Sequence, residues 1–446
     1  ALTGDVNIRT LNGSLTVMAA ATLLSGFAGG VAAVDGVTRL FARDNDNSGA
    51  DHLIINNTVR SADGKINLDS ENDVIASAEG DVTAGDVTRK LGATGAEIEV
   101  DAVDNITMAD GTIFNANAGG PNGGIDMDAV NGNITLGSVQ TSNASDNAVT
   151  IHTENGAIID GGDIHRDIVN TGNGGVILSA QTGIGSRGTG LNLVPNSLTD
   201  NFAPDAIDMT GAGTRLSAFT ESGDIQIQNI GALEITTLSD NNGGTPMGSA
   251  GAGTVTGVQI NDPLVLDPNS IIFITAASPM TISSQVTNFD GGNISLYALG
   301  GTPADTMTIN ANVQSLNGNG DVRIVSGGDM TLGAGVNVST QGDGVTSGAG
   351  RVAMGAGFDA TGKAADASID VNPLFAADVL PGLNAVSLAS TSTDPAGSLF
   401  DTANSVNTVA NLTMDETSRI STESGRIIID AQNNFTVGRV DADGNA

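Results

Sequence analysis

Oxygen-bearing side chains alternate along residues 44–51, in the order Asp-Asn-Asp-Asn-Ser-Gly-Ala-Asp. Asp44, Asp46, Ser48 and Asp51 could present oxygen atoms to one hard cation, and the intervening glycine permits the sharp turn of a calcium loop. The bidentate glutamate that closes such a loop is missing, because Ile55 stands at the twelfth position. We therefore favour a solvated acidic turn, and keep these four residues as the candidate calcium ligands.

Two pairs of aspartates have the spacing of side chains on one face of a strand. Asp126 and Asp128 are two residues apart, and Asp160 and Asp163 would share a face if the chain between them is nearly extended. Glycoside hydrolysis needs two carboxyl groups at a set separation, one of them acting as the acid. Sugar subsites usually stack on aromatic rings, however, and aromatic residues make up only 3% of this chain. We expect no catalytic residues.

Two glycine-rich stretches nearly match nucleotide-binding motifs. Residues 183–188 fit the spacing GxGxxG, but no helical pattern follows to place an N-terminus at a pyrophosphate. Residues 357–364 approach a phosphate-binding loop, but Ala364 replaces the hydroxyl that would hold magnesium. The chain has no cysteine, and its three histidines lack the spacing of a zinc site. We interpret both stretches as turns and expect no cofactor apart from the weak calcium candidate.

One short sequence pattern, called the phrase below, recurs along the whole sequence. The elements that it predicts must position all of the residues discussed above. A Gly, Asn or Asp turn is followed by five or six residues that alternate apolar and polar. Alternation with period two is typical of a strand with one buried face, and recurrence of one strand–turn unit is typical of a solenoid. The phrase is clearest at residues 132–136, 223–227, 292–296, 320–324 and 425–429.

The phrases predict an all-β fold, a right-handed parallel β-helix (β-solenoid) that forms a rod. Many phrases come in pairs about ten residues apart, such as 124–127 with 133–136, and we interpret each pair as two faces of one coil. The strands are too many and too short for one antiparallel sandwich, whereas parallel stacking buries a continuous aliphatic core. With roughly 20–25 residues per turn, the chain would hold about 18–22 turns.

Less regular stretches rich in Gly, Asn, Thr, Ser, Pro and Asp interrupt this rhythm. On a solenoid, such insertions become lateral loops, often on the binding face. No charge run or proline-rich linker divides the sequence, so residues 1–446 are predicted to form a single continuous domain. Because the chain lacks an initiator Met and opens and closes inside repeats, we expect a segment of a longer protein. The predicted insertions are Thr189–Ala206, Ser239–Gly257, Gly342–Gly350, Thr361–Ala367 and Ser390–Ser405.

The composition excludes several classes of partner. Acidic residues number 50 and basic residues 16, and the resulting net charge of −34 repels phosphate backbones, so no nucleic acid is expected as a partner. Residues 15–34 carry no charge, but they are rich in Ala, Gly, Thr and Ser and have no basic flank. We therefore expect no stable membrane span. The lack of cysteine excludes a disulfide scaffold.

The sequence pattern of residues 216–235 resembles the repeats of large bacterial adhesins of the filamentous-haemagglutinin type. These residues are Leu-Ser-Ala-Phe-Thr-Glu-Ser-Gly-Asp-Ile-Gln-Ile-Gln-Asn-Ile-Gly-Ala-Leu-Glu-Ile. The same sequence pattern is present in residues 174–185, 317–332 and 421–437. The family's amino-terminal secretion cap is not evident, so the chain would correspond to the repeat or shaft region. The resemblance implies a right-handed parallel β-helix that is exported to the bacterial cell surface and binds cells, glycans or itself. It implies no catalytic residue.

Fold and resemblance together predict a non-enzymatic structural and adhesive shaft of a large extracellular protein. It would act as a stiff spacer whose loops bind a cell-surface or glycan receptor, or other copies along the rod. One alternative is a self-assembling extracellular filament or sheath subunit, joined end to end through open β-edges. Another is a polysaccharide lyase or hydrolase built on the same fold.

Overall fold

Every regular element in the described part of the chain is a β-strand, and every pairing of known register in it is parallel. The predicted all-β, parallel β-solenoid class is therefore confirmed. Contacts divide the chain into two compact units, the first being Ala1–Gly185 with Ile207–Arg215 and Leu238–Val255, and the second the remainder. The structure is a computed structural model that describes residues 5–18, 31–33, 37–45, 49, 51–61, 65–84, 97–116, 123–161, 166–185, 206–211, 213–239, 253–261, 270–277, 279–298, 302–341, 350–358, 407–423 and 425–442.

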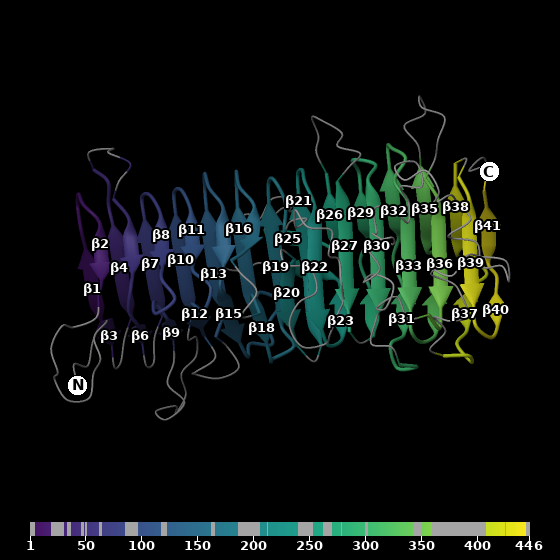
Figure 1. Cartoon of the computed structure of the whole chain (residues 1–446), viewed down its shortest axis with the longest axis horizontal. Helices are drawn as coiled ribbons and strands as arrows, with labels where there is room; N and C mark the ends of the chain where they lie inside the picture. Colours follow the sequence, from purple (N-terminus) through teal and green to yellow (C-terminus); the bar gives the residue numbers. More distant parts are fainter. Residues whose placement is uncertain are drawn as a thin grey trace. The chain divides into compact units, whose positions relative to one another are not determined.

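The first unit contains three parallel sheets, and each coil from β1 to β18 contributes one strand to each of them (Figure 1). The β1–β19 sheet consists of β1 (Val6–Arg9), β4 (Thr38–Ala42), β7 (Ile66–Ser70), β10 (Ile98–Ala102), β13 (Ile125–Ala129), β16 (Val149–Thr153) and β19 (Gly175–Ala180). The β2–β17 sheet consists of β2 (Leu15–Val17), β5 (Leu53–Ile55), β8 (Val74–Ala76), β11 (Ile106–Met108), β14 (Ile134–Leu136) and β17 (Ile158–Asp160). The β3–β20 sheet consists of β3 (Val31–Ala33), β6 (Val59–Ser61), β9 (Val82–Ala84), β12 (Ile113–Asn115), β15 (Ser138–Thr141), β18 (Ile168–Asn170) and β20 (Ile207–Thr210).

The second unit repeats this three-strand coil. The β22–β39 sheet consists of β22 (Ile225–Ile230), β27 (Ile271–Ala276), β30 (Asn293–Ala298), β33 (Val322–Ser326), β36 (Val352–Ala356) and β39 (Ile427–Ala431). The β23–β40 sheet consists of β23 (Leu233–Ile235), β28 (Met280–Ile282), β31 (Met307–Ile309), β34 (Met330–Leu332), β37 (Leu412–Met414) and β40 (Phe435–Thr436). The β21–β41 sheet consists of β21 (Thr214–Thr220), β26 (Val258–Ile260), β29 (Val286–Asn288), β32 (Val313–Leu316), β35 (Asn337–Gln341), β38 (Arg419–Thr422) and β41 (Arg439–Asp441). A separate two-stranded sheet, most of whose residues belong to the first unit, pairs β24 (Thr237–Ser239) with β25 (Thr254–Thr256).

The coils differ from the sequence prediction in two respects. Each has three faces where we predicted two, because a third strand of three to five residues follows each predicted pair. In the first unit a coil spans between 24 residues, from Ile125 to Val149, and 32 residues, from Val6 to Thr38. The coils are therefore longer and fewer than predicted. The right-handed winding is the hand in which parallel crossovers are almost always made.

The interior of the first unit is a dry aliphatic column. Alternate residues of β4, β7, β10, β13, β16 and β19 point inward and stack on their register partners in the next coil. None of these side chains exposes any surface, as the prediction of a continuous aliphatic core requires. The column consists of Leu40, Leu68, Val100, Met127, Ile151 and Leu178.

Asparagine and aspartate side chains join successive coils at the residue before a strand. The Asp73 carboxylate accepts the backbone N–H of Asn105 at 2.9 Å, and the Asn105 amide oxygen accepts the N–H of Asn133 at 2.9 Å. The Asn133 amide oxygen in turn accepts the N–H of Ala157 at 2.9 Å. These residues precede β8, β11, β14 and β17, so one row of side chains continues the backbone ladder around a corner. The turn residues that the sequence suggested therefore also fix the register between coils.

This row gives a direct test of the corner. Replacing Asn133 by alanine removes the acceptor for the Ala157 N–H and is expected to lower the free energy of unfolding by about 1 kcal/mol. The matched variant Asn133→Asp keeps an acceptor oxygen and should lose less than half as much. Urea unfolding followed by circular dichroism compares the two. Equal losses in both variants would show that the amide oxygen does not act as a coil-to-coil acceptor.

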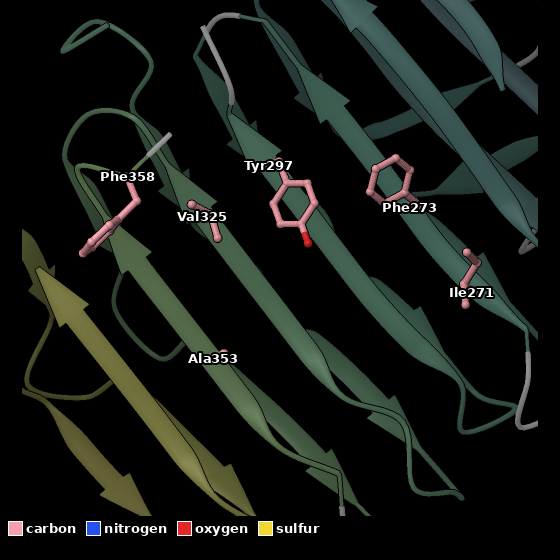
Figure 2. Packing of buried hydrophobic residues seen from close by; sticks show 6 residues of the cluster. All are labelled: Ile271, Phe273, Tyr297, Val325, Ala353 and Phe358. Carbon is pink, nitrogen blue, oxygen red and sulfur yellow. The ribbon is translucent and has the colours of Figure 1, made fainter. Parts of the chain in front are cut away.

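The outer face of the β22–β39 sheet carries a cluster of buried apolar residues, in addition to those of the inner face. Figure 2 shows Ile271, Phe273, Tyr297, Val325 and Ala353 along β27, β30, β33 and β36, with Phe358 just after β36, and all are at most 7% exposed. The Phe273 and Tyr297 rings meet edge to face with centroids 5.7 Å apart. The Arg323 guanidinium lies 5.4 Å from the Tyr297 ring centroid and is fully buried. Apolar and polar residues are mixed on this face, since Ser295 is the register partner of Phe273 and Thr275 that of Tyr297. The predicted alternation therefore holds here only in part.

Most residues of the predicted insertions lie outside the described residues. The prediction was wrong for the end of Ser239–Gly257, where Thr254–Thr256 form β25 and pair with β24. The strands on either side of residues 359–406 nevertheless keep the coil pattern. Met330 of β34 is in register with Leu412 of β37, and Val352 of β36 is in register with Ile427 of β39. The solenoid therefore resumes after this interruption on the same faces. The prediction of one continuous domain over residues 1–446 stays a prediction.

Candidate functional site

The structure describes two of the four candidate calcium ligands, Asp44 and Asp51, and Asp46 and Ser48 lie outside the described residues. Asp44 follows β4 and is 8% exposed. One of its carboxylate oxygens accepts the backbone N–H of Gly49 at 2.8 Å, which closes the acidic turn. This carboxylate therefore already has a structural role in the turn.

The second described candidate, Asp51, connects neighbouring coils. Its carboxylate accepts the backbone N–H of Gly13 at 2.6 Å, and its backbone carbonyl accepts the Asn72 side chain at 3.2 Å. Asn72 also donates to the Asp44 carboxylate at 3.3 Å. Both described candidates are thus tied to their neighbours by hydrogen bonds, and calcium binding at this turn stays a prediction.

A group of carboxyl groups covers the outer face of β7, β10 and β13. Asp69, Asp101 and Asp128 are register partners in one row, and Glu99 and Asp126 are partners in the next row. Because neighbouring strands lie about 4.8 Å apart, each carboxyl group has another directly beside it. We call these five residues the carboxyl ladder. Asp126 and Asp128 share one face of β13, as the sequence predicted.

Two cations contact the margins of the carboxyl ladder. The Lys65 ammonium forms an ion pair with Glu99, and one Arg43 guanidinium nitrogen lies 3.2 Å from an Asp69 oxygen. In the described part of the chain neither cation forms an ion pair with Asp101, which lies between them in the row. The centre of the ladder is therefore richer in negative charge than its edges.

This arrangement changes the acidity of two ladder residues. Burial, together with the charges of Glu99 and Asp69 and against the opposing charge of Lys65, raises the pKa of Asp101 to about 6. Burial also raises the pKa of Asp69, against the opposing charge of Arg43. Chemically, the ladder is a surface that takes up protons in mildly acidic solution. Its residue types alone do not make it a catalytic site.

A second set of carboxyl groups surrounds Asp167, the residue before β18. Asp167 is 1% exposed, and its Oδ2 accepts the backbone N–H of Asp208 at 2.8 Å. Burial raises the pKa of Asp167 well above its usual value, and the negative charge of Asp160 adds to this. Asp160 ends β17, whereas Asp163, its predicted partner, lies outside the described residues. The sequence did not single out Asp167, because its closeness to Asp160 depends on the corner between two sheets.

The histidines and glycine motifs add no further chemistry to these two groups. His152 follows Asp128 in the same outer row, and burial lowers its pKa. The His52 Nδ1 lies 3.1 Å from an Asp73 oxygen, and His165 lies outside the described residues. Gly183 and Gly185 have φ values of 138° and 67°, which supports the turn interpretation. Of the second glycine motif, the structure describes residues 357 and 358 alone.

Within the described ranges, no three His, Cys, Asp or Glu side chains are grouped so that they could hold a metal ion. In the same ranges, no helix has the length and apolar character needed to cross a membrane. No family model, no curated protein and no solved structure matches this chain. The class of protein defined by the fold is a parallel β-solenoid, and its function has to be argued from that architecture.

Proposed function

We propose that the chain is a non-enzymatic structural and adhesive shaft of a large extracellular protein of the filamentous-haemagglutinin type on the bacterial cell surface. The observation that supports this proposal is the unbroken parallel pairing from coil to coil. Within each unit, strands pair in register with both neighbouring coils: β10 does so over its whole length, and β30 over its whole length with β27 and from Ile294 to Ala298 with β33. The same pattern is present on all three faces.

Such stacking gives the mechanical properties of a spacer. Each added coil contributes hydrogen-bond ladders on three faces and a layer of aliphatic side chains, as in other repeat proteins whose units contact only their neighbours. Bending the stack requires distortion of all three ladders at once. Lateral segments can then bind without altering the coils, because residues 359–406 leave the register of β34 with β37 unchanged.

The experiment replaces residues 359–406 by a linker of a few residues and measures adhesion of the chain, coupled to beads, to host cells and glycans. The closest model is the junction of β33 and β34, where only three residues separate Ser326 from Met330. We expect an unchanged β circular dichroism spectrum and reduced adhesion. Undiminished adhesion would contradict binding through this segment. Sugar release from a polysaccharide, abolished by Asp126→Ala, would contradict the non-enzymatic proposal.

A second candidate function is end-to-end assembly of an extracellular filament. The last described coil exposes Phe435 (40%), Val437 (51%) and Val440 (42%), and these are the residues that a following coil, of the same chain or of another copy, would contact. Such a surface could be covered by a coil of another copy, with its strands adding to β39, β40 and β41. Electron microscopy of the purified chain would show concentration-dependent filaments that Phe435→Asp prevents. Single particles at all concentrations would contradict assembly.

A further inference from the structure

The first unit holds more carboxyl groups than its cations can neutralise, and it holds them at fixed positions. The carboxyl ladder places Asp101 between Asp69 and Asp128 on adjacent strands. Each of these strands is fixed by an inward residue of the aliphatic column, so the carboxyl groups cannot separate without disrupting the coil. The buried Asp167 is independent of the ladder and has Asp160 and Asp208 as acidic neighbours.

We propose that the first unit is a pH-responsive element, in which protons bound by the carboxyl ladder and by Asp167 stabilise the coils in mildly acidic surroundings. This inference goes beyond the proposed shaft, since a shaft could have any pH dependence. The ligand is the proton. The response arises from two separate places in one unit, which allows each to be tested without the other.

The sign follows from the direction of the pKa changes. A carboxyl group whose pKa is higher in the folded protein binds more protons when folded than when unfolded, so unfolding becomes easier as pH rises. For Asp101 the window lies between its ordinary value of 3.8 and about 6. Its contribution is most favourable below about pH 4 and is lost as the pH rises through 6. The raised pKa values of Asp69 and Asp167 act in the same direction.

Other groups facing the ladder act in either direction. The lowered pKa of His152 opposes the effect, because a neutral histidine favoured by the fold costs stability as pH falls. The Glu71 carboxylate, hydrogen-bonded to Arg43, also opposes it, but only at a more acidic pH, since its pKa is lowered. The titratable groups on the strands and corners around the ladder are Arg39 and Arg43 next to or in β4, Lys65, Asp69 and Glu71 at β7, Glu97, Glu99 and Asp101 at β10, Asp126 and Asp128 in β13, and His152 and Glu154 at β16.

The groups around Asp167 are fewer. Asp160 comes from β17 and Asp208 from β20, and Arg166 is the adjacent residue in the chain. The backbone N–H of Asp208 favours the ionised form of Asp167, but burial and the charge of Asp160 act against it. The variant Asp167→Asn keeps an acceptor for the Asp208 N–H while removing the titration. It is therefore the conservative test at this position.

The experiment measures thermal midpoints of the whole chain at pH 4.5, 5.5, 6.5 and 7.5 for the wild type, Asp101→Asn, Asp167→Asn and Glu79→Gln. The last variant is a control, because Glu79 is an exposed carboxyl group between β8 and β9 in the same unit. We expect both aspartate variants to differ least from the wild type at pH 4.5 and to melt several degrees higher at pH 7.5, since each removes a charge that costs stability. Glu79→Gln should follow the wild type throughout.

An aspartate variant with the same pH slope as the wild type would overturn the proposal for its own site. If Asp167→Asn fails to fold, Asp101→Asn still tests the ladder, and Asp69→Asn tests it a second time by removing a neighbouring charge. A slope reduced equally by Glu79→Gln would show that general charge repulsion, and not these carboxyl groups, causes the response.

Discussion

Replacing Gly320 by alanine is expected to lower the free energy of unfolding of the second unit by about 3 kcal/mol or more. A Cβ atom on Gly320 would overlap the backbone carbonyl of Gly292 in the preceding coil. The carbonyl of Gly320 is approached in the same way by Gly350 in the following coil. Since backbone atoms are held by the ladders on either side, neither coil can move away cheaply. The reason for glycine here is therefore close approach between coils.

The measurement is urea unfolding followed by circular dichroism, with Gly124→Ala as the matched control. A Cβ on Gly124 would find its nearest atom, the carbonyl oxygen of Asn147, at 3.6 Å, which is ordinary van der Waals contact. We expect the control to change stability by less than about 1 kcal/mol. A Gly320→Ala chain as stable as the control would contradict the close stacking of these three glycines.

Leu68→Ala is expected to cost about 2–5 kcal/mol, because it empties one layer of the aliphatic column. Leu68 is fully buried between Leu40 and Val100, its register partners in the two neighbouring coils. The neighbouring side chains are fixed by strands on three sheets, so they can fill the cavity only in part. The expected loss therefore lies well above that of an exposed substitution.

Thr107→Ala provides the comparison for this core variant. Thr107 is the exposed central residue of β11 in the same unit, and its replacement should change the free energy of unfolding by no more than about 0.5 kcal/mol. Both variants are measured by urea unfolding at one pH. If the two losses were equal, the inward column would not be the main source of stability in this unit.

The alternating pattern was sufficient to predict the strands, but not the number of faces of the coil. The phrase at 292–296 corresponds to β30, and that at 320–324 to β33. The third strand of a coil is short, with only three residues in β9 and β12, for example. An apolar–polar alternation is hardly detectable over so short a run. The coils were therefore predicted with two faces, and with too few residues per turn.

The apolar outer face of the second unit had a signal in the sequence. The run Ile271-Ile272-Phe273-Ile274 in β27 is continuously apolar, and such runs are typical of strands buried on both faces. We predicted alternation for every strand and therefore missed it. Tyr297 and Arg323 become neighbours of this run through the register between strands. The sequence of a single strand does not specify that register.

The same limit applies to the carboxyl ladder. Two residues of one strand, Asp126 and Asp128, could be placed on one face from their spacing alone. The neighbours Asp69 and Asp101 are 32 residues apart in the sequence, and coil lengths vary from one turn to the next, so no fixed period connects them. Their proximity and its effect on acidity became visible only with the pairing of β7 and β10.

The restored pairing on either side of residues 359–406 has a consequence for how such chains change over time. Since the pairings of β34 with β37 and of β36 with β39 keep the coil pattern on either side of this connection, we expect its length and composition to vary among related chains without altering the coils. In a solenoid of this kind, we expect recombination to replace the segment between β36 and β37 while the coils themselves are kept. For protein engineering, the same junction offers a position at which foreign peptides can be presented.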